Sequence, residues 1–262
     1  MHMHMHMHIA CTCTHTPCVQ EAAAVFVAKA NAASLGQSYA VVSSSSLDGK
    51  RDQNSLILLC KQYFDVASVR EHTAEVMATF DKATPVANGD LLVIFAVDVF
   101  GRSYLLASFH GDTNGLATLP VLAAVHALAQ RMPSHRLVFG LDANTYEAGG
   151  KTLQGVVEFG QDFVSKGYSS CWGDTPDPTK HTTYNARTFL QPQLQKAAKS
   201  TEKASKGDKN PKDFILFPRA TYSVVATTKD NTGLRSYTEG MVFPTLQFPS
   251  DHGLVATVLH EV

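Results

Sequence analysis

Seven polar side chains stand at the ends of short apolar runs, and their types are those that carry out acid–base and metal chemistry. They are Glu21, His110, Asp142, Asn144, Asp213, Asp251 and His252. Carboxylates accept protons and bind hard cations such as Mg²⁺, while imidazoles donate hydrogen bonds to oxygens that gain charge during a reaction. If the apolar runs are strands, these groups would meet on one rim, where rigid elements commonly position catalytic residues.

Each of these residues, taken alone, has a simpler structural explanation. Residues 142–144 (Asp-Ala-Asn) are typical of an Asx turn, and residues 250–252 (Ser-Asp-His) can simply precede a strand. The order in which all of them occur along the chain favours a shared function over a series of unrelated turns.

The segments that would position these residues alternate between strand and helix patterns. Short apolar runs predict strands at 56–60, 91–97, 104–109, 137–141, 213–217 and 254–259. Residues of high helix propensity predict helices at 22–33, 116–132 and 153–165. Because no linker of different composition separates them, the sequence predicts a single α/β domain over residues 9–262.

Residues 1–8 are four Met-His pairs, and we interpret them as a tag-like tract outside that domain. The tract lacks the apolar core of a signal peptide, although alternating histidines can capture a metal ion. The longest apolar run, Leu91 to Val97, falls far short of the roughly 20 residues that span a membrane. We therefore expect a soluble protein, without a prediction of its compartment.

The balance of charge argues against capture of nucleic acid by a global positive field. The chain has 22 basic and 23 acidic residues, which leaves a formal net charge of −1. The dense lysines of 196–212 are interpreted as a solvated surface. Cys11, Cys13 and Cys18 lie near His15 but lack a second ligand pair at zinc spacing, so we interpret them as ordinary thiols.

The polar motifs, in this order, resemble those of the endonuclease/exonuclease/phosphatase superfamily, which has the deoxyribonuclease I-like fold. Residues 19–21 (Val-Gln-Glu) are similar to its Leu-Gln-Glu motif, and the run ending at His110 resembles its Thr-His-Leu strand. Residues 140–144 resemble Gly-Asp-Phe-Asn with one leucine inserted, and 212–215 resemble Ile-Asp-Tyr-Ile. The terminal Ser-Asp-His motif is intact, and the resemblance covers about residues 17 to 260.

This resemblance implies a four-layer α/β (α+β) sandwich, in which two packed, mostly antiparallel sheets are flanked by helices. It also implies hydrolysis of a phosphoester with Mg²⁺ or Mn²⁺. Glu21 and Asp251 would hold the metal. Asp142 would orient or deprotonate the attacking water, and Asn144 would hold a phosphate oxygen or a metal-bound water.

The two imidazoles would stabilise the charged phosphate in the transition state. The resemblance implies this role for His252, with a hydrogen bond to Asp213 that holds its ring. His110 would donate to another phosphate oxygen. The loop 181–187 adds Tyr184 and Arg187 as candidate substrate-binding residues.

One departure leaves two hypotheses open. The family carries an Asn on a strand upstream of its Gln-Glu motif, whereas no Asn precedes Glu21 here, so that strand is shortened or replaced by 9–15. The protein is either a metal-dependent phosphoesterase or an impaired member of the same fold that acts as a binding or assembly subunit. The phosphoester would be a nucleic acid or a small phosphorylated molecule, and no partner protein is predicted.

Overall fold

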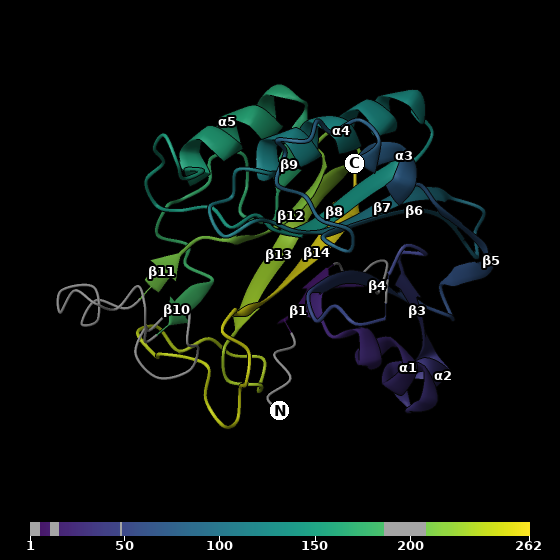
Figure 1. Cartoon of the computed structure of the whole chain (residues 1–262), viewed down its shortest axis with the longest axis horizontal. Helices are drawn as coiled ribbons and strands as arrows, with labels where there is room; N and C mark the ends of the chain where they lie inside the picture. The colour runs from purple at the N-terminus through teal and green to yellow at the C-terminus, as the bar shows by residue number, and fades with distance from the viewer. Residues whose placement is uncertain (1–5, 11–15, 48, 186–207) are drawn as a thin grey trace.

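Two β-sheets face each other in the computed structural model, which describes residues 6–10, 16–47, 49–185 and 208–262 (Figure 1). The larger sheet has the order β5-β6-β7-β8-β12-β9. Its strands are β5 (Phe64–Glu71), β6 (Leu91–Asp98), β7 (Ser103–His110), β8 (Arg136–Asp142), β9 (Tyr168–Ser170) and β12 (Asp213–Pro218). Neighbouring strands are antiparallel, apart from the parallel pair β7 and β8.

The smaller sheet is entirely antiparallel and has the order β1-β2-β4-β3. Its strands are β1 (His6–Ala10), β2 (Thr16–Ala22), β3 (Tyr39–Ser43) and β4 (Asn54–Cys60). Strand β1 includes residues 6–8 of the Met-His tract and pairs Ile9 with Pro17. The strand beside β2 therefore begins at His6, three residues before the segment 9–15 that was expected to replace the family's first strand.

Helices cover the outer face of each sheet, which confirms the four-layer sandwich (Figure 1). The larger sheet packs against α3 (Thr73–Met77), α4 (Thr118–Arg131) and α5 (Val156–Ser165). The smaller sheet packs against α1 (Ala24–Ala32), and α2 (Leu35–Ser38) follows it. Helix α4, the longest described helix at 14 residues, and the other described helices fall short of the length and hydropathy of a membrane span.

Strand β6 shows why the central strands are apolar along their whole length. Leu91 and Val93 pack toward the helices, whereas Leu92 and Ile94 pack toward the smaller sheet. A strand buried on both faces reads as a continuous apolar run, because both sets of alternating side chains lie in a core.

Several strands lie outside the ranges predicted from the sequence, among them three that are incompletely buried. These three are β3, β5 and β13 (Tyr222–Asp230). Strand β13 exposes most of its residues and forms a ribbon with β14 (Leu254–Glu261), which lies beside β1 (Figure 1). A second small ribbon joins β10 (Thr183–Asn185) to β11 (Asp208–Asn210), so the end of the lysine-rich stretch is a strand.

Candidate active site

Three of the predicted residues stand in one row across the larger sheet. The parallel pairing of β7 and β8 places His110 beside Asp142, and the antiparallel pairing of β8 and β12 places Asp213 on its other side. Adjacent strands lie about 4.8 Å apart, so strand register alone brings the three positions together. These residues are far apart in the sequence, and the sheet makes them neighbours.

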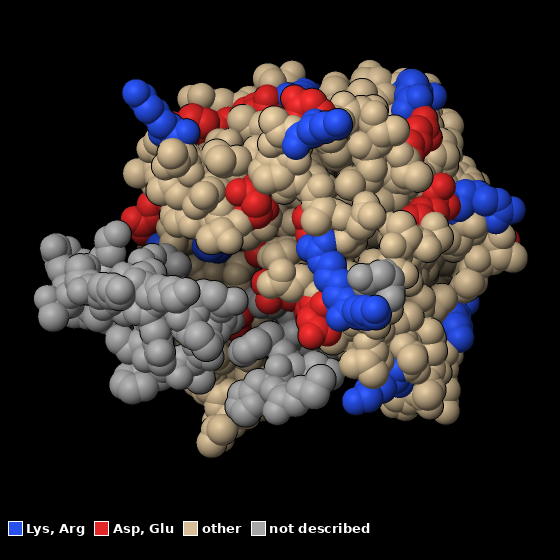
Figure 2. Space-filling model, viewed as in Figure 1, with Lys and Arg blue, Asp and Glu red and all other residues tan. Residues whose placement is uncertain are grey.

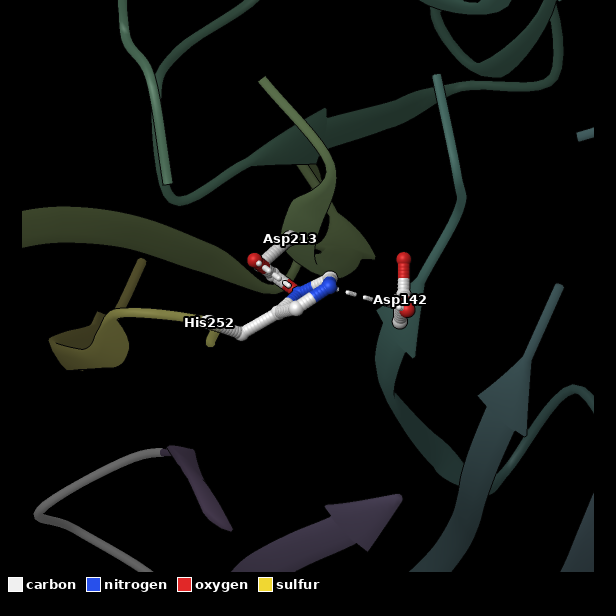
Figure 3. A group of neighbouring side chains, drawn as sticks. All are labelled: Asp142, Asp213 and His252. Atoms are coloured by element: carbon white, nitrogen blue, oxygen red, sulfur yellow. Dashed lines mark hydrogen bonds and ion pairs between the residues drawn. The ribbon is translucent and has the colours of Figure 1, made fainter. Parts of the chain in front are cut away.

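His252 reaches this row from the loop before β14, and its ring lies between two carboxylates (Figure 3). Its Nδ1 donates to Asp213, whose two carboxylate oxygens are each 3.0 Å away. The predicted hydrogen bond is therefore present. Because Nδ1 is used in this way, Nε2 is the nitrogen directed at Asp142, 3.7 Å from its Oδ2.

Asp142 lies between the two imidazoles and is almost fully buried. Its Oδ2 is 3.7 Å from Nε2 of His252 and 3.7 Å from Nε2 of His110. Burial raises the pKa of Asp142 above that of an ordinary aspartate, an effect that the two imidazoles and Lys212 oppose and Asp213 reinforces. The site thus holds a carboxylate that binds a proton more tightly than one in water.

Asn144 is fixed by four contacts at the turn after β8. Its backbone N–H donates to Oδ1 of Asp142 at 2.9 Å, so the Asx turn expected from the sequence is also present. Its Nδ2 donates to the Gly111 carbonyl at 2.8 Å and lies 3.4 Å from Oδ2 of Asp142. Its Oδ1 accepts a hydrogen bond from Nζ of Lys212 at 2.7 Å.

Glu21 comes from the smaller sheet, where β2 departs from regular pairing with β4. The register shifts between Val19 and Ala22, and Glu21 has a φ of 51°. Bulges of this kind re-aim side chains and are common beside active sites. Here the bulge accompanies a contact of 3.2 Å between Oε1 of Glu21 and Nε2 of His110, so both sheets contribute to one site.

A cavity of about 340 Å³ joins these groups, and all seven predicted polar residues except Asp213 line it. Figure 2 shows acidic side chains gathered around a hollow near the middle of this face. The described residues that line it are Glu21, Arg51, Gln53, Asp90, His110, Gly111, Asp112, Thr113, Asp142, Asn144, Tyr146, Lys212, Asp251 and His252.

The carboxylates in this cavity suit a hard divalent cation. Glu21 and Asp251 offer carboxylate oxygens, and Mg²⁺ is usually bound by one or two carboxylates together with water and substrate oxygens. Asp142, Asp213 and His252 also bring ligand atoms within 4.8 Å of one another. Nδ1 of His252 and the Asp213 carboxylate are engaged with each other, however, so we describe this group as a triad in which a hydrogen-bonded pair lies beside Asp142.

Several lining residues were not identified as site residues from the sequence. Arg51, from the connection between β3 and β4, pairs with the buried carboxylate of Asp90. Asp90 directly precedes β6, so its place at a strand end was a usable signal, whereas nothing in the sequence singles out Arg51. Lys212 was interpreted as solvated but is only 7% exposed, because it precedes a buried strand and turns into the cavity.

Of the four residues predicted to bind substrate, His110 and Asn144 line the cavity, whereas Tyr184 is not among its described lining residues. Tyr184 lies on β10, with Nζ of Lys209 3.8 Å from the centre of its ring. Arg187 lies outside the described residues. The aromatic side chain that lines the cavity in the described part of the chain is Tyr146, whose hydroxyl donates to the Thr113 carbonyl at 2.7 Å.

The fold is found in solved structures of low sequence identity. The catalytic domain of human Nocturnin with bound sulfate matches with a TM-score of 0.55 at 13% identity, covering 94% of this chain and 80% of that one. TDP2 of D. rerio, complexed with single-strand DNA product, matches with a TM-score of 0.53 at 14% identity, covering 93% and 84%.

An endonuclease/exonuclease/phosphatase from Bacteroides vulgatus matches with a TM-score of 0.57 at 13% identity, covering 93% of this chain and 83% of that one. No family model and no curated protein matches the sequence. The similarity of fold therefore rests on structure, and it agrees with the resemblance carried by the motifs.

Proposed function

Starting from the fold that this chain shares with endonuclease/exonuclease/phosphatase proteins, we propose that it is a metal-dependent hydrolase of phosphoester bonds. One observation carries the proposal: buried Asp142 has an imidazole on each side, and the ring of His252 is held by Asp213. A base flanked by two hydrogen-bond donors suits attack by water on a group that carries negative charge.

Asp142 is the base in this proposal. A carboxylate accepts a proton from water more readily when burial raises its pKa, because the ionised form is poorly solvated. The hydrogen bond from the Asn144 N–H fixes one of its oxygens at 2.9 Å and leaves the other facing the imidazoles. The water would lie on that side of the carboxylate and attack phosphorus in line with the leaving oxygen.

The imidazoles stabilise the charge that develops on the phosphate oxygens. His252 cannot rotate freely because Nδ1 is held by both oxygens of Asp213, so Nε2 stays directed at the cavity. His110 presents Nε2 to the same cavity from β7, next to Glu21. Preorganised donors of this kind lower the barrier because they need no rearrangement when charge appears.

Glu21 and Asp251 are the residues proposed to hold Mg²⁺ or Mn²⁺. When bound, such an ion supplies a Lewis acid that withdraws charge from the phosphoester oxygens. The contact between Glu21 and His110 links this pair of carboxylates to the acid–base residues. The upstream Asn that the resemblance implies as a further ligand has no counterpart before Glu21.

The substrate is proposed to be a phosphoester in a nucleic acid or a small phosphorylated molecule. Two lysine ammonium groups lie over tyrosine rings. Nζ of Lys209 is 3.8 Å from the centre of the Tyr184 ring, and Nζ of Lys229 is 3.7 Å from the centre of the Tyr237 ring. Aromatic faces combined with positive charge are typical of surfaces that bind single strands without sequence preference. A single-stranded oligonucleotide is accordingly the first substrate to test.

The test is a panel of phosphoesters assayed with Mg²⁺, with Mn²⁺ and with a chelator. The panel should contain single- and double-stranded DNA and RNA, nucleotides and inositol phosphates. We expect hydrolysis of at least one compound that stops in chelator and is lost in His252→Ala. Equal hydrolysis in chelator would contradict the metal dependence, and binding of a panel member without turnover would favour the impaired subunit.

A further inference from the structure

Lys212 is a buried cation inside the cavity that no step above requires. It lies directly before β12, is 7% exposed, and lines the cavity together with Asn144 and Tyr146. Its Nζ is 2.7 Å from Oδ1 of Asn144 and 5.3 Å from the centre of the Tyr146 ring. Removing an ammonium group from water is unfavourable unless it is paired, so its position needs an explanation.

The contact with Asn144 has a consequence for the direction of the amide. An ammonium group has only donors, so it can face the carbonyl oxygen of an amide but not its NH₂ group. Oδ1 of Asn144 is therefore directed at Lys212, and the NH₂ group is directed at the Gly111 carbonyl and at Asp142. If the amide were rotated by half a turn, its NH₂ group would face the ammonium of Lys212, and neither group could accept a hydrogen bond.

We propose that Lys212 is a positioning residue that fixes the amide of Asn144 with its NH₂ group toward Asp142 and the substrate. The effect on turnover rests on the proposed hydrolase function, but the orientation itself does not. Without the ammonium, only the Gly111 carbonyl and Asp142 would hold the amide in this orientation, and the opposite orientation would no longer place its NH₂ group against a cation. Only one of these orientations supplies a donor beside the proposed base.

The backbone at Lys212 is held independently of its side chain. Its N–H donates to Oγ1 of Thr182 at 3.0 Å, and its carbonyl accepts from the N–H of Ala143 at 2.7 Å. Both bonds survive any substitution except proline. A change of the side chain can therefore be tested without removing the anchor that holds this segment to β8.

The direct test observes the side-chain amide of Asn144 by NMR in metal-free, substrate-free protein. The NH₂ resonances are assigned by their loss in Asn144→Gly and are then followed in Lys212→Met. We expect them to shift or broaden in Lys212→Met and to stay in place in Lys166→Met. Lys166 is a matched control because it is also largely covered and pairs with Asp162, at the end of α5. Unchanged resonances in Lys212→Met would overturn the proposal.

The second test uses turnover and a double-mutant cycle. A misdirected group can cost about 10²-fold in rate, so we expect Lys212→Met to lower kcat by about that factor with little change in KM. If Lys212 acts through Asn144, adding Lys212→Met to Asn144→Gly should cause no further loss. The positioning role would be overturned if the losses in kcat of the two substitutions were additive, or if Lys212→Met raised KM and left kcat unchanged. If no phosphoester is hydrolysed while the NMR shift occurs, the hydrolase function fails and the positioning role stands.

Discussion

The two sides of the cavity are built in different ways. On the side of the larger sheet, Asp142, Asp213 and His252 have side chains that are 4%, 0% and 9% exposed. On the side of the smaller sheet, Glu21 is 20% exposed, lies in the irregular strand β2 and has a φ of 51°. We call these the triad side and the bulged side. The difference indicates that sheet register sets the positions of Asp142 and Asp213, whereas the position of the proposed metal ligand depends on one local distortion.

This comparison separates two kinds of defect. A change on the triad side alters groups whose positions are set by hydrogen bonds within the protein, so nothing added to the solution should restore them. A change on the bulged side would weaken the proposed metal site, which is filled from solution, so a higher metal concentration should compensate by mass action.

Asp142→Asn should cause the largest loss. Removing a general base typically lowers turnover by about 10²- to 10⁴-fold, because the attacking water keeps its proton. Raising the Mg²⁺ concentration should not restore the rate. Steady-state kinetics over a Mg²⁺ series measures both properties, with Asp162→Asn as a control on α5. Recovery of Asp142→Asn with Mg²⁺ would assign this carboxylate to the metal site instead.

Glu21→Gln should behave in the opposite way on the same Mg²⁺ series. The amide is a weaker ligand than a carboxylate for a hard cation, so the apparent Kd for Mg²⁺ should rise by about 10-fold or more. Turnover should recover partly as the concentration is raised. Calorimetric titration with Mg²⁺ gives the affinity without an assay of turnover. An unchanged affinity would remove Glu21 from the metal site and with it the contrast between the two sides.

The pH dependence of turnover should reflect the buried position of Asp142. An ordinary aspartate has a pKa of about 3.9, and burial raises the pKa of Asp142 above its usual value. Because the base must be ionised, kcat should fall as the pH drops through this raised pKa, at a higher pH than for an exposed carboxylate. A rate that stays constant down to about pH 4 would contradict this role.

The smallest effect concerns stability. A raised pKa means that the folded state binds the proton of Asp142 more tightly than the unfolded state does. Its contribution to the free energy of unfolding is therefore present at low pH and is lost as the pH rises through the raised pKa. Asp142→Asn, which cannot ionise, should be more stable than the parent by about 1 kcal/mol at pH 8.

Urea unfolding of the two proteins at pH 8 and at pH 5 measures this difference. The difference in free energy of unfolding between the two proteins should be smaller at the lower pH, because the parent regains stability as Asp142 takes up its proton. A variant that is less stable than the parent at pH 8 would show that the hydrogen bond to Asn144 outweighs the burial of the charge.

Much of the triad side could be predicted from the sequence. Residues such as Asp142 and Asp213 directly adjoin apolar runs, and the continuous apolar runs that become β6 and β8 are a property of the local sequence. Helix α4 was likewise identified from residues 116–132. These features are local, because a strand or a helix buries its side chains with a fixed period.

The bulged side and Lys212 were decided by the tertiary structure. The distortion at Glu21 exists only relative to β4, since a bulge is defined by the strand that it is paired with. Lys212 belongs to a lysine-rich stretch in the sequence, yet the strand that follows carries it into the cavity. The order of amino acids alone sets which chemical groups the chain holds and which apolar segments become its central strands. Which of those groups meet depended on strand pairing between distant segments, because register and burial are properties of both partners and cannot be read from either one alone.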